Sequence, residues 1–128
     1  KYSSEAHFET KDFKLHRIPD DGPSTKVSIK NEDSLSYYRQ MLAIRRLESA
    51  SGAMYKEKQI RGFCHLYSGQ EACAVGMKAA LRAGDDVITA YRCHGWTYLM
   101  GGSIAGILCE LTGHVEGLAR GKGGSMVR

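Results

Sequence analysis

The sequence has no long hydrophobic run. No stretch of 18 consecutive apolar residues occurs among its 128 residues, so it predicts no membrane span. The first 20 residues contain neither the apolar core of a signal peptide nor the arginine- and serine-rich pattern of a transit peptide. We therefore expect a protein that was never targeted or whose targeting segment has been removed.

Cysteine is scarce, and its spacing indicates neither a zinc site nor a disulfide framework. The four cysteines form no C-x-x-C pair. Two disulfides remain possible in principle, but Cys73 and Cys109 lie on apolar helical patterns that predict buried thiols. A reducing compartment is therefore favoured. The sequence also shows no Ser-His-Asp set, no paired catalytic carboxylates and no metal-ligand spacing.

Charge of one sign is not concentrated anywhere in the chain. The formal net charge is +4 and the sequence pI is about 8.9, but the basic residues are dispersed and no aromatic platform accompanies them. Nucleic-acid binding is therefore not expected.

Proline occurs only twice, whereas more than half of the 15 glycines follow residue 100. A tail so rich in glycine predicts loop, because glycine loses the most backbone freedom on ordering.

The first half of the chain predicts an arm followed by a long helix. Residues 1–30 are polar and irregular, with Pro19 and Pro23 bracketing a turn, and we expect an extended N-terminal arm. A helix is predicted over residues 32–58, with Asn31 as its N-cap. Its predicted apolar face comprises Leu35, Tyr38, Leu42, Ile44, Leu47 and Met54.

The second half predicts helices around one strand. Ser68 and Glu71 have the spacing of a capping box, which predicts a helix that ends before Gly84. Its small residues Ala72, Val75, Gly76 and Ala79 predict a face for close packing. Residues 87–90 are β-branched and uncharged, which predicts a buried strand in a parallel α/β architecture. A short helix is expected near residues 96–100, and a further one is predicted from Ser103 to Gly113, followed by loop from residue 114.

Candidate functional residues stand at the boundaries of these elements. His65 precedes a helix start, where an imidazole could face an anionic or reacting group; the alternative is a buried histidine bonded to a carbonyl. Tyr91 and Arg92 follow the predicted strand and suit a phosphate or diphosphate; the alternative is a salt bridge to an acidic loop residue. His94 could supply a second imidazole or a structural hydrogen bond. Residues 120–125 resemble a phosphate cradle in composition but lack P-loop spacing, so a flexible basic loop is the alternative.

Several strings together resemble the α subunits of thiamine-diphosphate-dependent E1 components of 2-oxo acid dehydrogenase complexes, most closely the eukaryotic mitochondrial, pyruvate-specific type. The likeness runs from about residue 8 to residue 126. The strings are Tyr37-Tyr38-Arg39, Ile60-Arg61-Gly62-Phe63-Cys64-His65-Leu66, Gly69-Gln70-Glu71-Ala72, Ile88-Thr89-Ala90-Tyr91-Arg92, His94-Gly95, Glu110-Leu111-Thr112-Gly113 and Gly121-Lys122-Gly123-Gly124-Ser125-Met126.

The resemblance implies a fold, a chemistry and partners. It implies an α/β thiamine-diphosphate-binding fold, of which this N-terminal portion is mostly helical with one or two strands. It implies an α2β2 heterotetramer with an E1 β subunit in the mitochondrial matrix. Pyruvate would be decarboxylated oxidatively, and the acetyl group would pass to the lipoyl domain of E2. By motif position, Tyr91 and Arg92 look like ligands of the cofactor diphosphate, and His65 looks like a catalytic residue.

The sequence departs from the family pattern at its end. The Gly-Asp-Gly run and later Asn that bind Mg²⁺ in the family would lie beyond residue 128, so no metal ligand is assigned within the chain. Val127-Arg128 also replace the expected histidine after Met126. We therefore expect residues 31–128 to be a truncated portion of the cofactor-binding domain that is inactive alone. The alternatives are an acetoin or branched-chain 2-oxo acid dehydrogenase E1 α subunit, or a non-catalytic paralogue that binds E1 β.

Overall fold

The computed structural model describes residues 4–19 and 22–125. Asp20 and Asp21 of the turn predicted between Pro19 and Pro23, and Met126 of the last matching string, lie outside these ranges. The elements are β1 (Glu5–Glu9), β2 (Lys26–Lys30), α1 (Asn31–Lys56), α2 (Glu71–Ala80), α3 (His94–Leu99) and α4 (Ile104–Thr112). This mostly helical content with one two-stranded sheet agrees with the prediction. No helix within these ranges combines the length and apolar character needed to cross a bilayer. The chain divides into two compact units, Lys1–Tyr38 and Arg39–Arg128.

The first unit contains an antiparallel hairpin of β1 and β2. Phe8 lies opposite Val27 and Glu9 lies opposite Lys26. Because successive side chains point to opposite faces of a strand, the apolar pair and the oppositely charged pair belong to different faces. Phe8 and Val27 are nevertheless exposed. The sheet is antiparallel and is formed by the N-terminal segment, whereas the sequence placed its predicted strand at residues 87–90.

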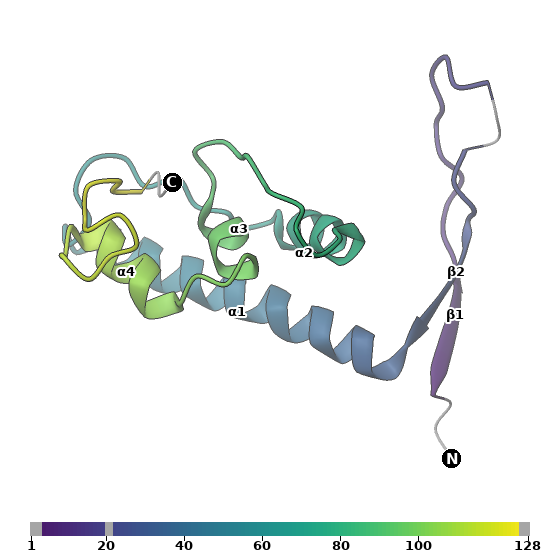
Figure 1. The fold of residues 1–128 in the computed structure, drawn as a ribbon, viewed down its shortest axis with the longest axis horizontal. Coiled ribbons are helices and arrows are strands. Elements are labelled where there is room, and N and C mark those ends of the chain that lie inside the picture. The colour runs from purple at the N-terminus through teal and green to yellow at the C-terminus, as the bar shows by residue number, and fades with distance from the viewer. Residues whose placement is uncertain (1–3, 20–21, 126–128) are drawn as a thin grey trace. The chain divides into compact units, whose positions relative to one another are not determined.

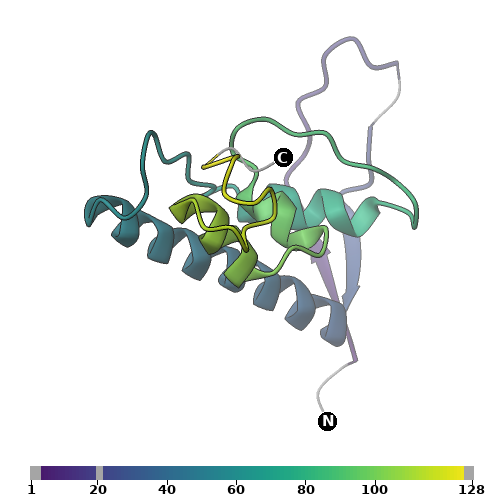
Figure 2. The ribbon, with the colours of Figure 1, turned by 60° about the vertical axis from the view of Figure 1, so that its left-hand side comes forward.

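The second unit is built on the C-terminal part of α1. In Figures 1 and 2, the helices α2, α3 and α4 lie along one side of this part of α1. A hydrophobic cluster joins α1 to α4 and to the loop after α1: Leu47, Ile60, Ile107 and Leu111 are almost fully buried. This cluster fixes the start of the loop that carries the first candidate residue.

The predicted long helix is confirmed with shifted ends and a shorter buried face. Asn31 is the first residue of α1 rather than its N-cap. Ile44 and Leu47 are buried as expected, but Leu35 is 53% and Tyr38 is 59% exposed. The apolar pattern therefore identified the helix, whereas burial is confined to the part of α1 in the second unit.

The predicted capping box of α2 is wrong. The N-cap is Gln70, whose side chain makes no capping bond, and the helix begins at Glu71. The carboxylate of Glu71 instead accepts hydrogen bonds from the Gly69 N–H, at 2.9 Å, and from the guanidinium of Arg45. The hydrogen bond from Arg45 is the largest cause of a lowered pKa for Glu71. Arg45 on α1 thus binds the Glu71 carboxylate that the predicted capping box would have used.

The buried face and the end of α2 also differ from expectation. Ala74 and Val75 are buried, whereas Ala72, Gly76 and Ala79 are exposed. The helix ends at Ala80. Of the predicted face of small residues, only Val75 is buried, and the buried face of α2 also includes Ala74 and Glu71, which pairs with Arg45 on α1.

The predicted buried strand at residues 87–90 is wrong in the described chain. These residues belong to no strand, and the Ile88 side chain is 100% exposed. A β-branched run becomes a strand only where neighbouring strands complete its hydrogen bonds, and the described sheet consists of β1 and β2 alone. The burial expected for two thiols also failed, since Cys73 is exposed and Cys109 is half-buried, although both are unpaired as expected.

The predicted helix from Ser103 to Gly113 is confirmed. The Ser103 hydroxyl accepts a hydrogen bond from the Gly106 N–H at 3.0 Å, and Gly113 closes α4 with φ = 78°. The predicted short helix is also present, as α3. The segment after Gly113 forms turns, and Gly121 lies so close to the Gly113 backbone that a Cβ on Gly121 would overlap it.

Candidate cofactor-binding site

Three candidate residues from two separate loops lie together. The ring centroids of His65 and Tyr91 are 4.6 Å apart, and the guanidinium carbon of Arg92 lies 5.7 Å from the Tyr91 ring centroid. The Phe63 ring lies 4.5 Å from the His65 ring. We call these four side chains the aromatic–arginine cluster. The Tyr91 ring thus contacts an imidazole and a guanidinium.

Buried residues anchor both loops that carry the cluster. Ile60 and Tyr67 are buried on either side of the first loop, and Cys93 is buried directly after Arg92. The Arg92 guanidinium donates a hydrogen bond to the carbonyl of Leu66, which joins the two loops. The alternative of a salt bridge to an acidic residue is therefore not what the described residues form.

The cluster has the chemistry of an anion site with a titratable neighbour. Tyr91 and Arg92 are exposed and His65 is half-buried. A guanidinium carries five N–H donors in a planar fork, and the Leu66 carbonyl uses only a part of this capacity. A phenol hydroxyl beside such a fork can add a bond to a phosphoryl oxygen. The residues present therefore fit a diphosphate, and the neighbouring imidazole could accept or donate a proton.

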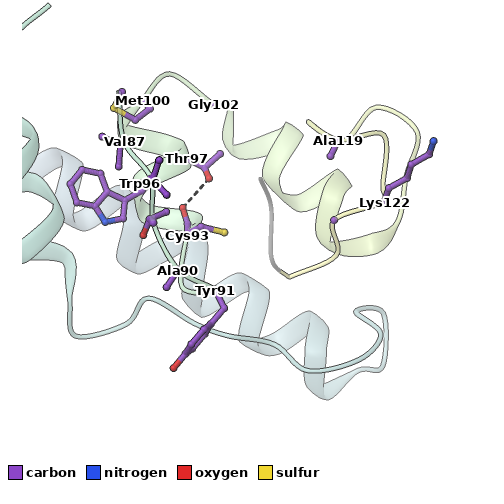
Figure 3. A pocket seen from close by; sticks show the side chains of 13 residues that line it. Val87, Ala90, Tyr91, Cys93, Trp96, Thr97, Met100, Gly102, Ala119 and Lys122 are labelled. Carbon is purple, nitrogen blue, oxygen red and sulfur yellow. Dashed lines mark hydrogen bonds between the residues drawn. The ribbon is translucent and has the colours of Figure 1, made fainter. Parts of the chain in front are cut away.

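An open groove extends from this cluster. Its volume is about 1100 Å³. Figure 3 shows Tyr91 and Met100 toward opposite ends of the groove, with the Tyr91 ring directed away from Trp96. The Thr97 hydroxyl donates a hydrogen bond to the Cys93 carbonyl at 2.9 Å, and both residues line the groove. This bond stabilises the first turn of α3. A space of this size could hold a drug-sized organic molecule.

Cys64 is not a candidate nucleophile. Burial raises the pKa of the Cys64 thiol, and the charge of Glu48 raises it further. The thiolate is the reactive form of cysteine, so this position favours the inert thiol.

The glycine-rich loop is not a free phosphate cradle. Its backbone N–H groups at Ala119, Gly121 and Gly123 donate to the carboxylate of Glu110 at 2.7, 2.9 and 2.6 Å. Burial alone would raise the pKa of Glu110, but these N–H bonds outweigh it and lower that pKa. An internal carboxylate thus occupies the donors that a phosphate would need.

His94 has a structural environment rather than an exposed one. Its ring is completely buried, with Nδ1 at 2.9 and 3.1 Å from the two carboxylate oxygens of Glu48. The Nε2 atom lies 3.0 Å from the carbonyl oxygen of Ser125, and the Ser125 hydroxyl donates to the Phe63 carbonyl. Both ring nitrogens therefore have partners within the protein.

Two of the three buried glutamates of the described residues, Glu48 and Glu110, were not predicted from the sequence, although a signal was present. Glu48 follows Ile44 and Leu47 at helical spacing, and Glu110 lies between Ile107 and Leu111 on the same face. An acidic residue within an apolar helical face predicts a buried group that needs donors.

Within residues 4–19 and 22–125, no group of three or more histidine, cysteine, aspartate or glutamate side chains is placed to hold a metal ion.

Comparison with known families places this site in context. The family model of the dehydrogenase E1 component matches residues 39–128, and the chain belongs to this family. That range contains the aromatic–arginine cluster, the glycine-rich loop and the buried carboxylates of Glu48 and Glu110.

Several relatives are similar over nearly the whole chain. The chain is 65% identical to the pyruvate dehydrogenase E1 component subunit alpha type I, mitochondrial, of Ascaris suum over 124 residues, which is 97% of the chain. It is 64% identical over 124 residues to the probable mitochondrial subunit alpha of Caenorhabditis elegans. It is 50% identical to the human somatic form over 125 residues. The chain spans 31% of the length of the Ascaris relative.

Proposed function

We propose that this chain is part of the α subunit of a thiamine-diphosphate-dependent pyruvate dehydrogenase E1. The observation that carries the proposal is the juxtaposition of His65, Tyr91 and Arg92 beside an open groove. Membership in the dehydrogenase E1 component family and the printed names of the relatives support it. The fold of the complete domain would be the α/β thiamine-diphosphate-binding fold.

Each cluster residue has a proposed role. Arg92 offers a planar fork of donors to the diphosphate, and the Tyr91 hydroxyl adds a further bond. His65 faces the substrate side and holds or moves a proton at an imidazole nitrogen. When bound, thiamine diphosphate supplies the nucleophilic carbon and electron sink for decarboxylation. The ligands of Mg²⁺ would come from outside the described residues.

The relatives' names suggest the wider setting. We infer a mitochondrial matrix protein that assembles with an E1 β subunit as α2β2 and serves the lipoyl domain of E2. The activity would be oxidative decarboxylation of pyruvate with acetyl transfer. Residues 1–128 alone would be inactive, since the groove is open and no metal site lies within the described part.

Cofactor binding tests the proposal. In the complete gene product co-expressed with an E1 β subunit, we expect Arg92→Ala to weaken thiamine-diphosphate binding by roughly tenfold to a hundredfold, the loss typical of a hydrogen bond to a charged group. Tyr91→Phe should weaken it less. Titration calorimetry in the presence of Mg²⁺ measures both constants. Arg46→Ala, a change at an exposed arginine on α1, is the matched control.

The same preparation separates the alternatives. Equal affinity for Arg92→Ala and Arg46→Ala would contradict the assignment. Turnover of branched-chain 2-oxo acids or acetoin in preference to pyruvate would indicate another E1 α type. Assembly with β without any turnover would indicate a non-catalytic paralogue. Turnover of pyruvate by residues 1–128 alone would overturn the expectation of inactivity.

A further inference from the structure

A buried polar network runs from α1 to the loop that carries His65. It begins at Glu48 on α1, passes through His94 at the start of α3, and reaches Ser125 in the glycine-rich loop. It ends at the carbonyl of Phe63, two residues before His65. Glu48 and His94 are completely buried, and Ser125 is 7% exposed.

His94, in the middle of this network, has a hydrogen-bond partner at each ring nitrogen. A carbonyl oxygen can only accept, so His94 Nε2 donates to Ser125. Nδ1 lies 2.9 and 3.1 Å from the two carboxylate oxygens of Glu48. The ring is therefore held by hydrogen-bond partners on both sides, Glu48 at Nδ1 and Ser125 at Nε2. The ring therefore fixes the Ser125 backbone relative to α1.

The far end of the network reaches a partly exposed stretch of the loop. Phe63 is 69% exposed, while the neighbouring Cys64 is partly buried against the hydrophobic cluster. The Ser125 hydroxyl holds the carbonyl of Phe63, and Arg92 holds the carbonyl of Leu66. His65 lies between these two held positions. Hydrogen bonds to the backbone on both sides thus add to the packing of Cys64 in holding His65 beside Tyr91.

We propose that Glu48, His94 and Ser125 are positioning residues that hold His65 against Tyr91. The inference rests on the proposed function for its catalytic consequence. The position of the 61–66 loop can be measured independently. Glu48 and His94 act through Ser125, because the hydrogen bonds of these two side chains join them to each other and to Ser125 rather than to the aromatic–arginine cluster.

Ser125→Ala tests the proposal with little loss of volume. In the complete gene product assembled with E1 β, the change removes the bond to Phe63 and leaves the Ser125 carbonyl for His94. We expect trypsin to cleave after the exposed Arg61 roughly fivefold to tenfold faster, because cleavage follows the population of the opened loop. We also expect kcat for pyruvate to fall by a similar factor at saturating cofactor, with a smaller change in KM.

Ser49→Ala is the matched control. The Ser49 hydroxyl also donates to a backbone carbonyl, that of Arg45, at 2.8 Å, but on an exposed face of α1. This control should leave cleavage after Arg61 and kcat unchanged. Mass spectrometry of the fragments distinguishes cleavage at Arg61 from cleavage elsewhere.

Glu48→Gln is a second variant that keeps the shape of the side chain. Its amide oxygen can still accept from His94 without the charge, so a smaller increase in cleavage after Arg61 is expected. A drop in melting temperature without faster cleavage at Arg61 would reduce Glu48 to a structural role and contradict the proposal.

The two readouts separate this inference from the proposed function. Faster cleavage together with lower kcat supports positioning. Wild-type cleavage and wild-type kcat in Ser125→Ala overturn it, and faster cleavage with unchanged kcat overturns the positioning of His65. If no preparation turns over pyruvate, the proposed function fails, and cleavage after Arg61 alone decides whether the network holds the loop.

Discussion

Glu110 is a completely buried acidic residue whose carboxylate accepts three backbone N–H bonds from one loop. We expect Glu110→Gln to lower the free energy of unfolding by about 1–3 kcal/mol, because the amide –NH2 would face donors and leave a buried group unsatisfied. Urea unfolding of the complete protein measures this change. Glu116→Gln, at an exposed position in the same loop, should change stability little. Equal stability of both variants would contradict the role assigned to Glu110.

The same carboxylate makes the loop sensitive to acid. The pKa of Glu110 is lowered from its ordinary value of 4.5 in the folded protein, so its stabilising contribution is present above that value. The contribution is lost as the pH falls from 4.5 through the lower folded pKa. We expect the wild-type protein to lose more stability over this range than Glu110→Gln. Unfolding curves recorded at a series of pH values compare the two slopes, and parallel slopes would refute the expectation.

At the scale of elements, glycine-to-alanine changes in α4 and α2 are expected to change stability in opposite directions. Gly113 ends α4 with φ = 78°, where an L side chain costs about 1–2 kcal/mol, so Gly113→Ala should destabilise by that amount. Gly76 lies exposed within α2 with open space at its Cβ position, so Gly76→Ala should stabilise by about 0.5–1 kcal/mol. Thermal unfolding measures both. Changes of the same sign would refute the local interpretation.

The elements also show which structural information is local in the sequence. The start and end of α4 were predictable because Ser103 caps it and Gly113 ends it within a few residues. The packing face of α2 was not, because Arg45 lies 26 residues from the glutamate it pairs with. The strand expected at residues 87–90 needs neighbouring strands, which a short window cannot supply. Helix caps could therefore be predicted from the local sequence, whereas pairing between residues distant in the sequence could not.

At the scale of the whole molecule, the exposed segment at residues 87–90 creates an aggregation risk. Ile88 is 100% exposed and lines the open groove, so Ile88→Lys removes no buried contact. We expect this variant of residues 1–128 to associate less and to unfold at an unchanged temperature, because exposed apolar patches and unpaired edges promote association. Light scattering measures the first effect and calorimetry the second.

Val115→Lys is the comparison for this change. Val115 is 68% exposed but does not line the groove. If both variants reduce association equally, general charge rather than the groove is responsible.

The candidate site was predicted in part. His65, Tyr91 and Arg92 were identified individually from their positions beside helices and a strand-like run, and the structure brings their side chains together. Their catalytic and cofactor-binding roles remain predictions. The partners of Glu48 and Glu110 could not be read from the sequence, because each carboxylate binds groups that only the folded chain brings near.

The close approach of Gly121 to Gly113 has an evolutionary consequence. A methyl group at residue 121 would overlap the Gly113 backbone, and Gly121 itself has φ = 72°. A side chain at residue 121 therefore requires the turn between the two residues to be rebuilt, whereas a Cβ on Gly113 would come no closer than 4.0 Å to the Gly121 carbonyl oxygen and is disfavoured by the positive φ alone. Among homologous sequences, loss of glycine at position 121 should therefore coincide with insertions or deletions between the two positions.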